Sequence, residues 1–402
     1  MPKPNIYFAS SISGADSKDH ENAGIISKQL QQHGRVMTEL IGNPDIHAIE
    51  AKNMANGVNI AHRDLGWLAD SDVMVADITN GSIGVGKEIG FALDARRIPV
   101  LAIHKKGKKV SQMVDKFKHP LLTNVEYENS EDLETQVDGF FGDLNVLGTL
   151  RPNLILCDGI DGSGKGVVSK AIGDFFSRGQ SDVFDVTEFS KKEGHIPSWD
   201  DVKSNFPEGG ALLVAEPTYC GIGKIIREEL IKKGSNHDVM SVAQAYSLDR
   251  AILFDRLVGP AIESGITVVM DRGVFATQVY QPVQGEMFEG YDSEYILGMV
   301  RGLPGNQREM DYVPGLILLP DVDPKIAMER LGNRSKDDNA LFEESNFQNR
   351  IADVYASRRI EKWYTRRGSK IVHLPQKEGE GPSVTKERTL AAYEKYLDRI
   401  EG

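Results

Sequence analysis

A glycine-rich segment of eight residues constrains the fold of this chain more than any other feature of its sequence. The segment GIDGSGKG (159–166) lies between an apolar, strand-like stretch and a helical pattern, VVSKAIGDFF. Its glycines permit a tight turn whose backbone N–H groups can surround a phosphate at the N-terminus of the following helix. Lys165 then supplies a point charge for the β- and γ-phosphates of a nucleotide. The pattern predicts a nucleotide-binding loop, with a chance glycine turn as the alternative.

This loop departs from the usual phosphate-binding motif at its last position. The motif normally ends in Ser or Thr, whose hydroxyl ligates magnesium, whereas Gly166 stands there in this chain. The strand before the loop and the helix after it still supply the required context. We therefore expect ATP to bind through Gly159, Ile160, Asp161, Gly162, Ser163, Gly164, Lys165 and Gly166.

Polar residues end the other apolar segments of the second half of the chain. The segments predicted as buried parallel strands are 153–159, 211–217, 266–272 and 315–321. Ligands bind at the carboxyl ends of such strands, so Glu216, Asp271 and Arg272 should approach Lys165. Asp271 could hold magnesium through water and Arg272 could bind an acceptor phosphate with two N–H groups, with a surface ion pair that caps the strand as the alternative. Convergent charges of this kind suit phosphoryl transfer.

Five segments together resemble thymidylate kinase over nearly all of residues 151–380. They are GIDGSGKG, EPTYCGIGKIIRE (216–228), AYSLDR (245–250), DRGVFATQVYQ (271–281) and DVDPKIAMERLGNR (321–334). The resemblance implies ATP and Mg²⁺ as cofactors, with Asp161 near the transferring phosphoryl group and Arg272 on the acceptor monophosphate. It also implies that Tyr246 and Arg250 hold the base and that Tyr280 lies beside the deoxyribose. Ala215 replaces an arginine that many bacterial members carry before their Glu-Pro pair.

Two arginines mark a candidate lid. Arg330 and Arg334 lie on a predicted helix that leads into a polar segment, NRSKDDNALFEE, which resembles the lid over the nucleotide phosphates in the same family. Closure of such a lid would exclude water from the transfer. A solvated, charged helix end is the alternative.

The first half of the chain has its own alternation of strands and helices. Strands are predicted at 4–9, 72–78 and 98–103, with helical patterns at 19–33 and 86–97. The less regular segment 42–60 is interpreted as a loop over the site. A chain of 402 residues exceeds one compact core, and the acidic, then apolar stretch 128–150 suggests a last helix and a connection. We therefore predict two doubly wound α/β domains with parallel sheets, at 1–148 and 149–402.

A second glycine turn precedes a helix in the first half. Ser82, Gly84 and Gly86 form a flexible turn, and Glu88 lies just inside the helix that follows. A helix N-terminus with a serine hydroxyl could bind one phosphate, while Glu88 directs a carboxylate at whatever the phosphate anchors. Ordinary helix capping explains the turn equally well.

Residues 5–141 resemble the nucleoside 2-deoxyribosyltransferase superfamily and, more closely, its 2′-deoxynucleoside 5′-phosphate N-hydrolase branch. The segments that carry the resemblance are YFASSISG (7–14), RDLGWLADSDVMVADIT (63–79) and SIGVGKEIG (82–90). The resemblance implies that Glu88 is the nucleophile or charge stabiliser at C1′, that Asp64 positions sugar or catalytic groups, and that Tyr7 lies near the reacting centre. A carboxylate under the ring suits the oxocarbenium-like state of glycosidic cleavage.

The same resemblance assigns the 5′ end of the substrate. Ser11, Ser82 and Ser111 match phosphate-binding serines of the N-hydrolase branch, which favours a deoxynucleoside monophosphate as the substrate. In that branch the serine matching Ser111 reaches across a dimer interface, so the resemblance also implies a homodimer. Ser13 replaces a basic residue of the N-hydrolase loop.

Composition limits the partners. A formal net charge of −12 argues against broad binding of nucleic-acid polymers. The sequence holds no uninterrupted apolar run long enough for a membrane span, and the start MPKPNIYFAS lacks the pattern of a secretory signal, so we expect a cytoplasmic protein. Cys157 and Cys220 do not have the spacing of a zinc site.

These observations predict a bifunctional deoxynucleotide enzyme. One domain would hydrolyse the N-glycosidic bond of a deoxynucleoside 5′-monophosphate, and the other would phosphorylate dTMP or a related monophosphate with ATP. Two alternatives stay open. The first domain could transfer deoxyribose between bases, or the chain could sense nucleotides through a kinase half that binds without turnover, which Gly166 would favour.

Overall fold

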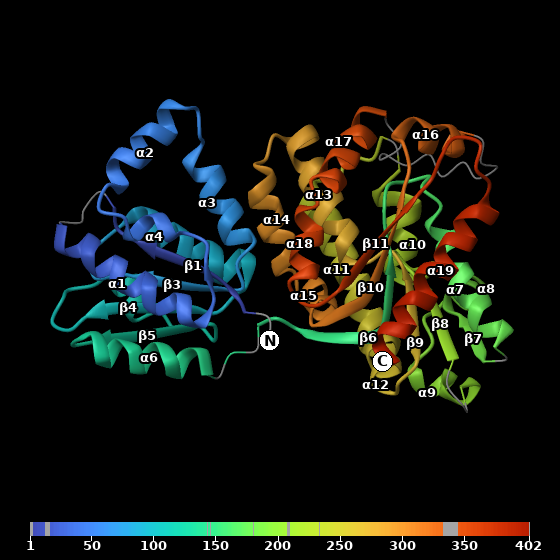
Figure 1. Ribbon diagram of the computed structural model, residues 1–402, viewed down its shortest axis with the longest axis horizontal. Coiled ribbons are helices and arrows are strands. Elements are labelled where there is room, and N and C mark those ends of the chain that lie inside the picture. Colours follow the sequence, from blue (N-terminus) through green and yellow to red (C-terminus); the bar gives the residue numbers. More distant parts are fainter. Residues whose placement is uncertain are drawn as a thin grey trace. The chain divides into compact units, whose positions relative to one another are not determined.

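The computed structural model describes residues 3–12, 17–142, 144, 146–179, 181–206, 210–232, 234–332 and 345–401. The chain folds into two compact units (Figure 1). The first comprises residues 1–147 and 292–303, and the second comprises 148–291 and 304–402. Each unit is built on its own sheet.

The first unit holds a five-stranded parallel sheet in the order β2-β1-β3-β4-β5. The chain leaves β1 on one side for β2 and crosses to the other side for β3, which creates a topological switch point at the carboxyl ends of β1 and β3. The elements are β1 (Asn5–Ser10), α1 (Ser17–His33), β2 (Arg35–Val36), η1 (Glu39–Gly42), α2 (Ile46–Ala55), α3 (Ile60–Ala69), β3 (Val73–Asp77), α4 (Ile83–Gly90), η2 (Phe91–Arg96), β4 (Val100–Lys105), α5 (Gln112–Asp115), β5 (Leu122–Tyr127) and α6 (Ser130–Gly142).

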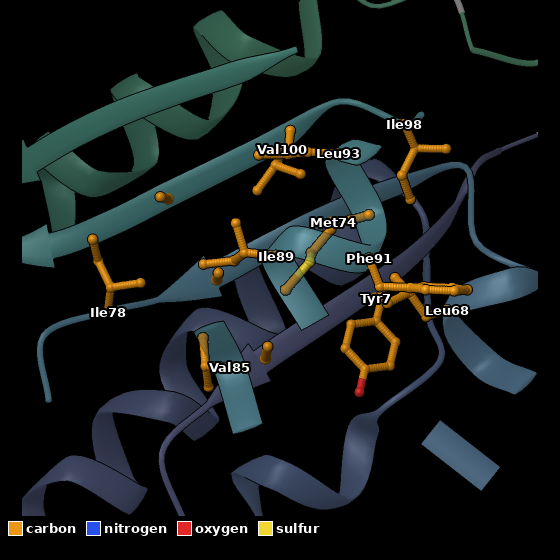
Figure 2. Close-up of a cluster of buried hydrophobic side chains, with 14 residues drawn as sticks. Tyr7, Leu68, Met74, Ile78, Val85, Ile89, Phe91, Leu93, Ile98 and Val100 are labelled. Atoms are coloured by element: carbon orange, nitrogen blue, oxygen red, sulfur yellow. The ribbon is translucent and has the colours of Figure 1, made fainter. Parts of the chain in front are cut away.

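Alternate residues of β1 point to opposite faces of this sheet. Ile6 and Phe8 pack against α1 and α6, whereas Tyr7 and Ala9 join the cluster under α3, α4 and η2 (Figure 2). A strand with both faces buried is typical of a doubly wound sheet. The alternation places the Tyr7 side chain on the same face as α4, the helix that carries Glu88.

Helix α14 (Ser293–Gly302) belongs to the first unit although the chain supplies it between elements of the second. Arg301 Nη1 donates to the Ala69 carbonyl and to Asp70 Oδ1, both at 2.7 Å. A Cβ on Gly302 would lie 1.7 Å from the Ala95 carbonyl oxygen, so only glycine permits this close approach. The first unit is therefore not continuous in sequence, which a single predicted boundary does not capture.

The second unit holds a six-stranded parallel sheet in the order β11-β10-β6-β9-β8-β7. Strand β6 lies inside the sheet, and the glycine-rich loop follows its carboxyl end. The first elements are β6 (Thr149–Cys157), α7 (Lys165–Arg178), β7 (Asp182–Asp185), α8 (Val186–Glu193), α9 (Trp199–Val202), η3 (Lys203–Asn205), β8 (Gly210–Ala215), α10 (Gly221–Ile225), η4 (Ile226–Leu230), α11 (Val239–Leu253), η5 (Phe254–Val258) and α12 (Gly259–Glu263). They are followed by β9 (Thr267–Asp271), α13 (Val274–Glu289), α15 (Pro304–Met310), β10 (Tyr312–Asp321), α16 (Pro324–Gly332), α17 (Ser345–Ala356), α18 (Arg359–Thr365), β11 (Lys370–Pro375) and α19 (Pro382–Glu401).

One face of this sheet packs against α7 and α19. Ile155 and Cys157 of β6 contact Val168 and Ile172 of α7, and Tyr393 and Tyr396 of α19 complete the cluster. Burying the first helix after β6 against the sheet holds the start of α7 beside the strand end. The N-terminus of α7 is therefore positioned for an anion.

The predicted fold class, two α/β units with parallel sheets, is confirmed. The sequence did not reveal β2, β5, β7 and β11, and segment 42–60 contains α2 rather than only a loop. In the described part of the chain, every helix is too short or too polar to cross a membrane.

Candidate active sites

A partly buried carboxylate, that of Glu88, lies in a cavity of about 540 Å³ in the first unit. The Tyr7 hydroxyl donates a hydrogen bond of 2.8 Å to Glu88 Oε1. The cavity is lined by Tyr7, Ser11, Asp64, Ser82, Gly84 and Glu88 among others, so most of the predicted residues meet there. The carboxyl end of β1 and the start of α4 line this cavity, which therefore lies at the switch point of the sheet, where ligands bind in folds of this class.

Burial tunes the ionisation of this pair. Burial raises the pKa of Glu88 to about 7, and the nearby Asp64 charge acts in the same direction while the Tyr7 hydrogen bond opposes it. Burial and the Glu88 carboxylate raise the pKa of Tyr7 well above its ordinary value. Tyr7 therefore stays a neutral donor, and Glu88 is poised between its two forms near neutral pH.

Asp64 is held by an arginine that sequence reasoning did not single out. Arg63 Nε donates to Asp64 Oδ1 at 2.9 Å, and Arg63 Nη1 donates to both carboxylate oxygens of Glu50 at 2.9 and 3.1 Å. Burial raises the pKa of Asp64, against the influence of Arg63. Because Glu50 lies on α2 and Arg63 on α3, this chain of ion pairs ties α2 to the cavity.

The predicted phosphate-binding serines lie in two neighbouring cavities. Ser11 and Ser82 line the cavity of Glu88, and Ser82 is the N-cap of α4, where its hydroxyl accepts from the Val85 N–H at 3.3 Å. Ser111 and Gly86 instead line an adjacent cavity of about 320 Å³, which also includes Ser82. Helix capping and a phosphate site are thus compatible, since the Ser82 hydroxyl can still donate.

In the second unit the glycine-rich loop forms the expected turn before α7. Gly159, Gly162 and Gly164 have φ angles of 143°, 79° and 94°, which disfavour any residue with a side chain. Lys165 Nζ donates to the carbonyl oxygens of Gly159 and Ile160 at 3.2 and 2.8 Å. The lysine is 8% exposed, and its ammonium lies against the carbonyl oxygens of the loop.

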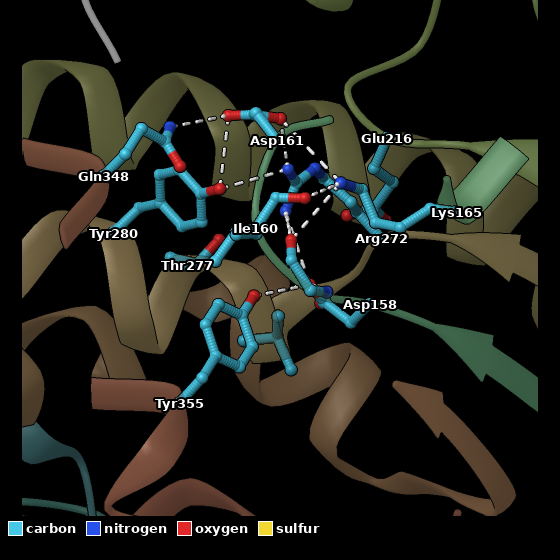
Figure 3. A network of polar contacts seen from close by, with 12 residues as sticks. Asp158, Ile160, Asp161, Lys165, Glu216, Arg272, Thr277, Tyr280, Gln348 and Tyr355 are labelled. Carbon is cyan, nitrogen blue, oxygen red and sulfur yellow. Dashed lines mark hydrogen bonds and ion pairs between the residues drawn. The ribbon is translucent and has the colours of Figure 1, made fainter. Parts of the chain in front are cut away.

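Arg272 joins the loop to the end of β9. Its Nη1 donates to the Gly159 carbonyl at 3.0 Å and its Nη2 donates to Asp161 Oδ1 (Figure 3). The Tyr280 hydroxyl accepts from Arg272 Nη2 at 3.1 Å and donates to Asp161 Oδ2 at 3.2 Å. The predicted residues Asp161, Arg272 and Tyr280 therefore converge on the phosphate loop.

The charges of this cluster are strongly coupled. Burial would raise the pKa of Asp161, but the Arg272 and Lys165 charges lower it to about 2. Burial, reinforced by Arg272, lowers the pKa of Lys165 to about 8. A bound phosphate would add negative charge beside Lys165 and favour its protonated form.

Arg250 is buried against Glu216, and Glu216 lies near Lys165 and Arg272 (Figure 3). The guanidinium of Arg250 is 1% exposed and donates to Glu216 Oε2 from Nε and Nη2 at 2.9 and 2.6 Å. It leaves no accessible edge for a base, and Glu216 is similarly enclosed. Tyr246 is half-buried near the cluster, where burial raises its pKa to about 12. Tyr246 is therefore more exposed than Arg250.

Asp271 lies beside the position of the missing hydroxyl. A Cβ built on Gly166 would be 3.7 Å from Asp271 Oδ2, an ordinary van der Waals contact. An oxygen ligand at this place is of the kind that magnesium prefers, so the predicted role of Asp271 stays a prediction that the geometry allows. Among the described residues, no three His, Cys, Asp or Glu side chains form a ready-made metal site.

The lid arginines are only partly within the described chain. Arg330 Nη1 donates to Gln376 Oε1 at 2.6 Å, and Gln376 Nε2 donates to the Ser163 carbonyl at 2.7 Å. Arg330 thus reaches the phosphate loop through Gln376. Arg334 lies outside the described residues.

Three further side chains contact the cluster of Asp161 and Arg272 or each other without having been predicted. Asp158 precedes the loop and accepts from Arg272 Nη1 at 3.3 Å and from the Tyr355 hydroxyl at 2.7 Å. Gln348 Nε2 donates to Asp161 Oδ2 at 3.4 Å (Figure 3). Tyr355 and Gln348 both lie on α17, which follows the predicted lid segment, so only the fold brings them to the loop.

Curated relatives match the first unit closely. A 5-hydroxymethyl-dUMP N-hydrolase from Esox lucius is 33% identical over 143 residues, covering 35% of this chain and 98% of its own. The corresponding protein of Danio rerio is 33% identical over 138 residues, covering 34% and 95%. The chain belongs to the 2′-deoxynucleoside 5′-phosphate N-hydrolase family. A nucleoside 2-deoxyribosyltransferase family model also matches residues 6–123 of this N-hydrolase domain.

The second unit matches a different family model. The thymidylate kinase model covers residues 200–370, so both predicted resemblances are confirmed. A solved thymidylate kinase structure from Candida albicans aligns with 60% of this chain and 91% of its own, at 16% identity and a TM-score of 0.38. The order of the six parallel strands shows by itself that the second unit has an α/β fold. The chain is an enzyme with an N-hydrolase-family domain, followed by a second domain that a thymidylate kinase family model matches in part.

Proposed function

We propose that this chain is a bifunctional deoxynucleotide enzyme. The first domain hydrolyses the N-glycosidic bond of a deoxynucleoside 5′-monophosphate, and the second phosphorylates dTMP or a related monophosphate with ATP. The observation that carries the proposal is the Tyr7–Glu88 pair at 2.8 Å in a cavity that also contains the N-terminus of α4. Because relatives of the first domain are named 5-hydroxymethyl-dUMP N-hydrolases, 5-substituted pyrimidines are the first substrates to test.

The proposed hydrolysis assigns a role to each group of the cavity. Ionised Glu88 bonds to C1′ or stabilises its positive charge while the C1′–N bond breaks and its electron pair leaves with the base. Water then adds hydroxide to C1′, and its proton goes to the departed base. Where Glu88 has bonded to C1′, that bond breaks in the same step and its electron pair returns to the carboxylate. Asp64, fixed by Arg63, binds a sugar hydroxyl, and Ser11, Ser82 and the α4 N-terminus bind the 5′-phosphate.

The phosphate assignment is tested by removing the phosphate. Purified protein should release base from 5-hydroxymethyl-dUMP but at least about 100-fold more slowly from the corresponding nucleoside, because the 5′-phosphate supplies binding energy that orients C1′. Chromatography of the free base measures both rates. Equal rates would contradict the phosphate site while leaving Glu88 as a glycosidase residue.

Base release should depend on pH through Glu88. Because burial raises the pKa of Glu88 to about 7 and the reaction needs its ionised form, kcat/KM should rise about tenfold per pH unit below 7 and level off above it. The Tyr7 hydrogen bond lowers this pKa, so Tyr7→Phe should move the rise to higher pH. Rates from pH 5 to 9 measure this. A profile that falls with increasing pH, or one unmoved by Tyr7→Phe, would contradict these roles.

In the proposed kinase reaction, an oxygen of the acceptor phosphate attacks the γ-phosphorus of ATP and ADP leaves with the bond electrons. Lys165 and the loop N–H groups hold the ATP phosphates, Arg272 holds the acceptor phosphate, and Arg330 approaches from α16. Magnesium, bound by Asp271 through water, would neutralise phosphate charge. When the acceptor binds, the guanidinium of Arg272 leaves Asp161 and donates to the acceptor phosphate instead.

Restoring the missing hydroxyl should improve the use of magnesium. Gly166 has no positive φ, and a Cβ there meets Asp271 Oδ2 only at 3.7 Å, so Gly166→Ser fits without strain. The magnesium concentration that gives half-maximal phosphorylation should fall roughly 10-fold. Gly166→Ala is the matched control, since it adds the Cβ without the hydroxyl. An equal gain from alanine would attribute the effect to helix stability rather than to a metal ligand.

A deoxyribosyltransferase is the second candidate for the first domain, because the family model that matches it carries that name. The two reactions differ in whether water or a second base accepts the sugar. Adding an excess of free adenine or cytosine to 5-hydroxymethyl-dUMP distinguishes them. A new nucleotide would support transfer, and deoxyribose 5-phosphate alone would support hydrolysis.

We also propose that the first domain functions as a homodimer. Ser111 does not line the cavity of Glu88 but the adjacent one. Two apolar side chains that line these cavities, Ile83 in the first and Met113 in the second, are 95% and 81% exposed. A second copy covering these side chains could bring its own serine to the phosphate. Sedimentation of wild type and Met113→Asp tests this, and a wild-type monomer would contradict it.

A further inference from the structure

A buried glutamate outside the predicted site contacts the turn that carries Arg272. Glu309 lies on α15 and is 2% exposed. Its Oε1 and Oε2 accept from the Val274 N–H at 2.9 and 2.8 Å, and Val274 is the first residue of α13. A Cβ on Gly273 would lie 2.3 Å from Glu309 Oε1, so the carboxylate packs directly against the turn backbone. Glu309 therefore caps the helix that begins after Arg272.

The turn between β9 and α13 has an unusual backbone conformation. Arg272 has a φ of 70°, in the left-handed region that residues with a side chain rarely occupy. Its N–H donates to the Cys157 carbonyl at 2.9 Å, and the Asp271 carbonyl accepts from the Glu216 N–H at 3.0 Å. Such a conformation persists only where its surroundings hold it. The Glu309 contact is the anchor on the carboxyl side of Arg272.

Arg250 provides the counter-charge for this anchor. Arg250 Nε lies 2.6 Å from Glu309 Oε2, and Arg250 Nη2 lies 2.6 Å from Glu216 Oε2. Burial opposes the charge of Arg250, but Glu216 and Glu309 raise its pKa, so the guanidinium stays ionised. One buried cation thus links the glutamate at the end of β8 with the glutamate behind the Arg272 turn. This arrangement explains why Arg250 is absent from the site surface.

We propose that Glu309 is a positioning residue for the acceptor monophosphate: it holds the Asp271–Gly273 turn so that Arg272 faces the phosphate loop, with Arg250 as its counter-ion rather than as a base-binding group. The inference rests on the proposed kinase function. It adds a residue that touches neither nucleotide but controls how the acceptor is bound.

Separate binding measurements test this role without requiring turnover. Isothermal titration with dTMP and with ATP, each alone, should show that Glu309→Ala weakens dTMP binding roughly 10-fold or more while ATP binding changes less than about 2-fold. Glu309→Gln keeps one oxygen for the Val274 N–H and should bind dTMP more tightly than the alanine variant. Gly273→Ala forces a methyl group against the same carboxylate and should weaken dTMP binding in the same selective way.

Glu263→Ala is the matched control, because it removes another hydrogen-bonded glutamate of the second unit, the acceptor of the Tyr312 hydroxyl at 2.9 Å. It should leave both affinities unchanged. If the wild type binds both ligands, the proposed kinase function stands. Equal loss of affinity for dTMP and ATP in the Glu309 variants, or an unchanged affinity for dTMP, would then overturn the positioning role alone. Absence of dTMP binding to wild type would instead overturn the proposed kinase function and this inference with it.

Discussion

Replacing Glu88 by glutamine should lower base release by at least about 1,000-fold, because the amide cannot stabilise positive charge at C1′ or bond to it as a carboxylate does. The shape of the cavity should survive, since the amide oxygen can still accept from Tyr7. Removing a buried carboxylate whose pKa is raised to about 7 also removes an unfavourable buried charge, so the variant should be at least as stable as wild type above that pH. Initial rates of free-base formation and thermal unfolding measure the two effects.

Phosphorylation of dTMP by the Glu88→Gln protein provides the internal control. The two sites lie in separate units, so the kinase rate should stay within about 2-fold of wild type. Glu131→Gln, an exposed glutamate at the start of α6, should affect neither activity. Loss of both activities from Glu88→Gln would show that the sites are not independent.

Replacing Lys165 by alanine should lower diphosphate formation by about 100- to 1,000-fold. The lysine is the cation that the loop places beside the nucleotide phosphates, and in its present position it donates to the Gly159 and Ile160 carbonyls. Removing it loses the charge that stabilises the transferring phosphoryl group. A coupled assay of ADP formation, together with titration of ATP binding, measures the loss.

Lys170→Ala is the matched control, because Lys170 lies on the same helix with its side chain exposed. It should retain full kinase activity. Base release should be unchanged in both lysine variants. A Lys165→Ala enzyme with near-wild-type kinase activity would exclude the glycine-rich loop as the ATP site.

The central strands and both glycine turns could be predicted because each has a strong signal in its own residues and is followed directly in the sequence by a recognisable element. A buried parallel strand is a short apolar run, and a polar or glycine-rich residue marks its carboxyl end. These rules led to Glu88, Lys165 and Arg272, which lie next to the strand ends and glycine turns that the patterns marked, whereas Tyr7 was implied only by the family resemblance. The edge strands β2 and β7 were missed because they span only Arg35–Val36 and Asp182–Asp185, too short for a periodic signal. The edge strands β5 and β11 are six residues long, but most of their residues are only half-buried or exposed, so they lack the apolar run of a buried strand.

Other parts of the sites depend on packing that no local pattern encodes. Nothing in the sequence around Glu309 distinguishes it from an ordinary glutamate on a helix. Its contact with the turn after β9 depends on how α15 packs in the folded unit. Arg250 matched a base-binding position in the kinase family, yet two buried carboxylates enclose its guanidinium. Glu50 lies in a segment interpreted as a loop, so its pairing with Arg63 could not be anticipated. The inclusion of α14 in the first unit likewise depends on a glycine contact visible only in three dimensions.

The central claim is that one chain carries two independent sites for deoxynucleoside monophosphates. The most direct test incubates the purified protein with each deoxynucleoside monophosphate, 5-hydroxymethyl-dUMP included, with and without ATP and magnesium, and separates free bases from diphosphates. We expect free base from at least one substrate without ATP, and diphosphate from dTMP or a close relative only with ATP and magnesium. Formation of neither product from any substrate would contradict the claim.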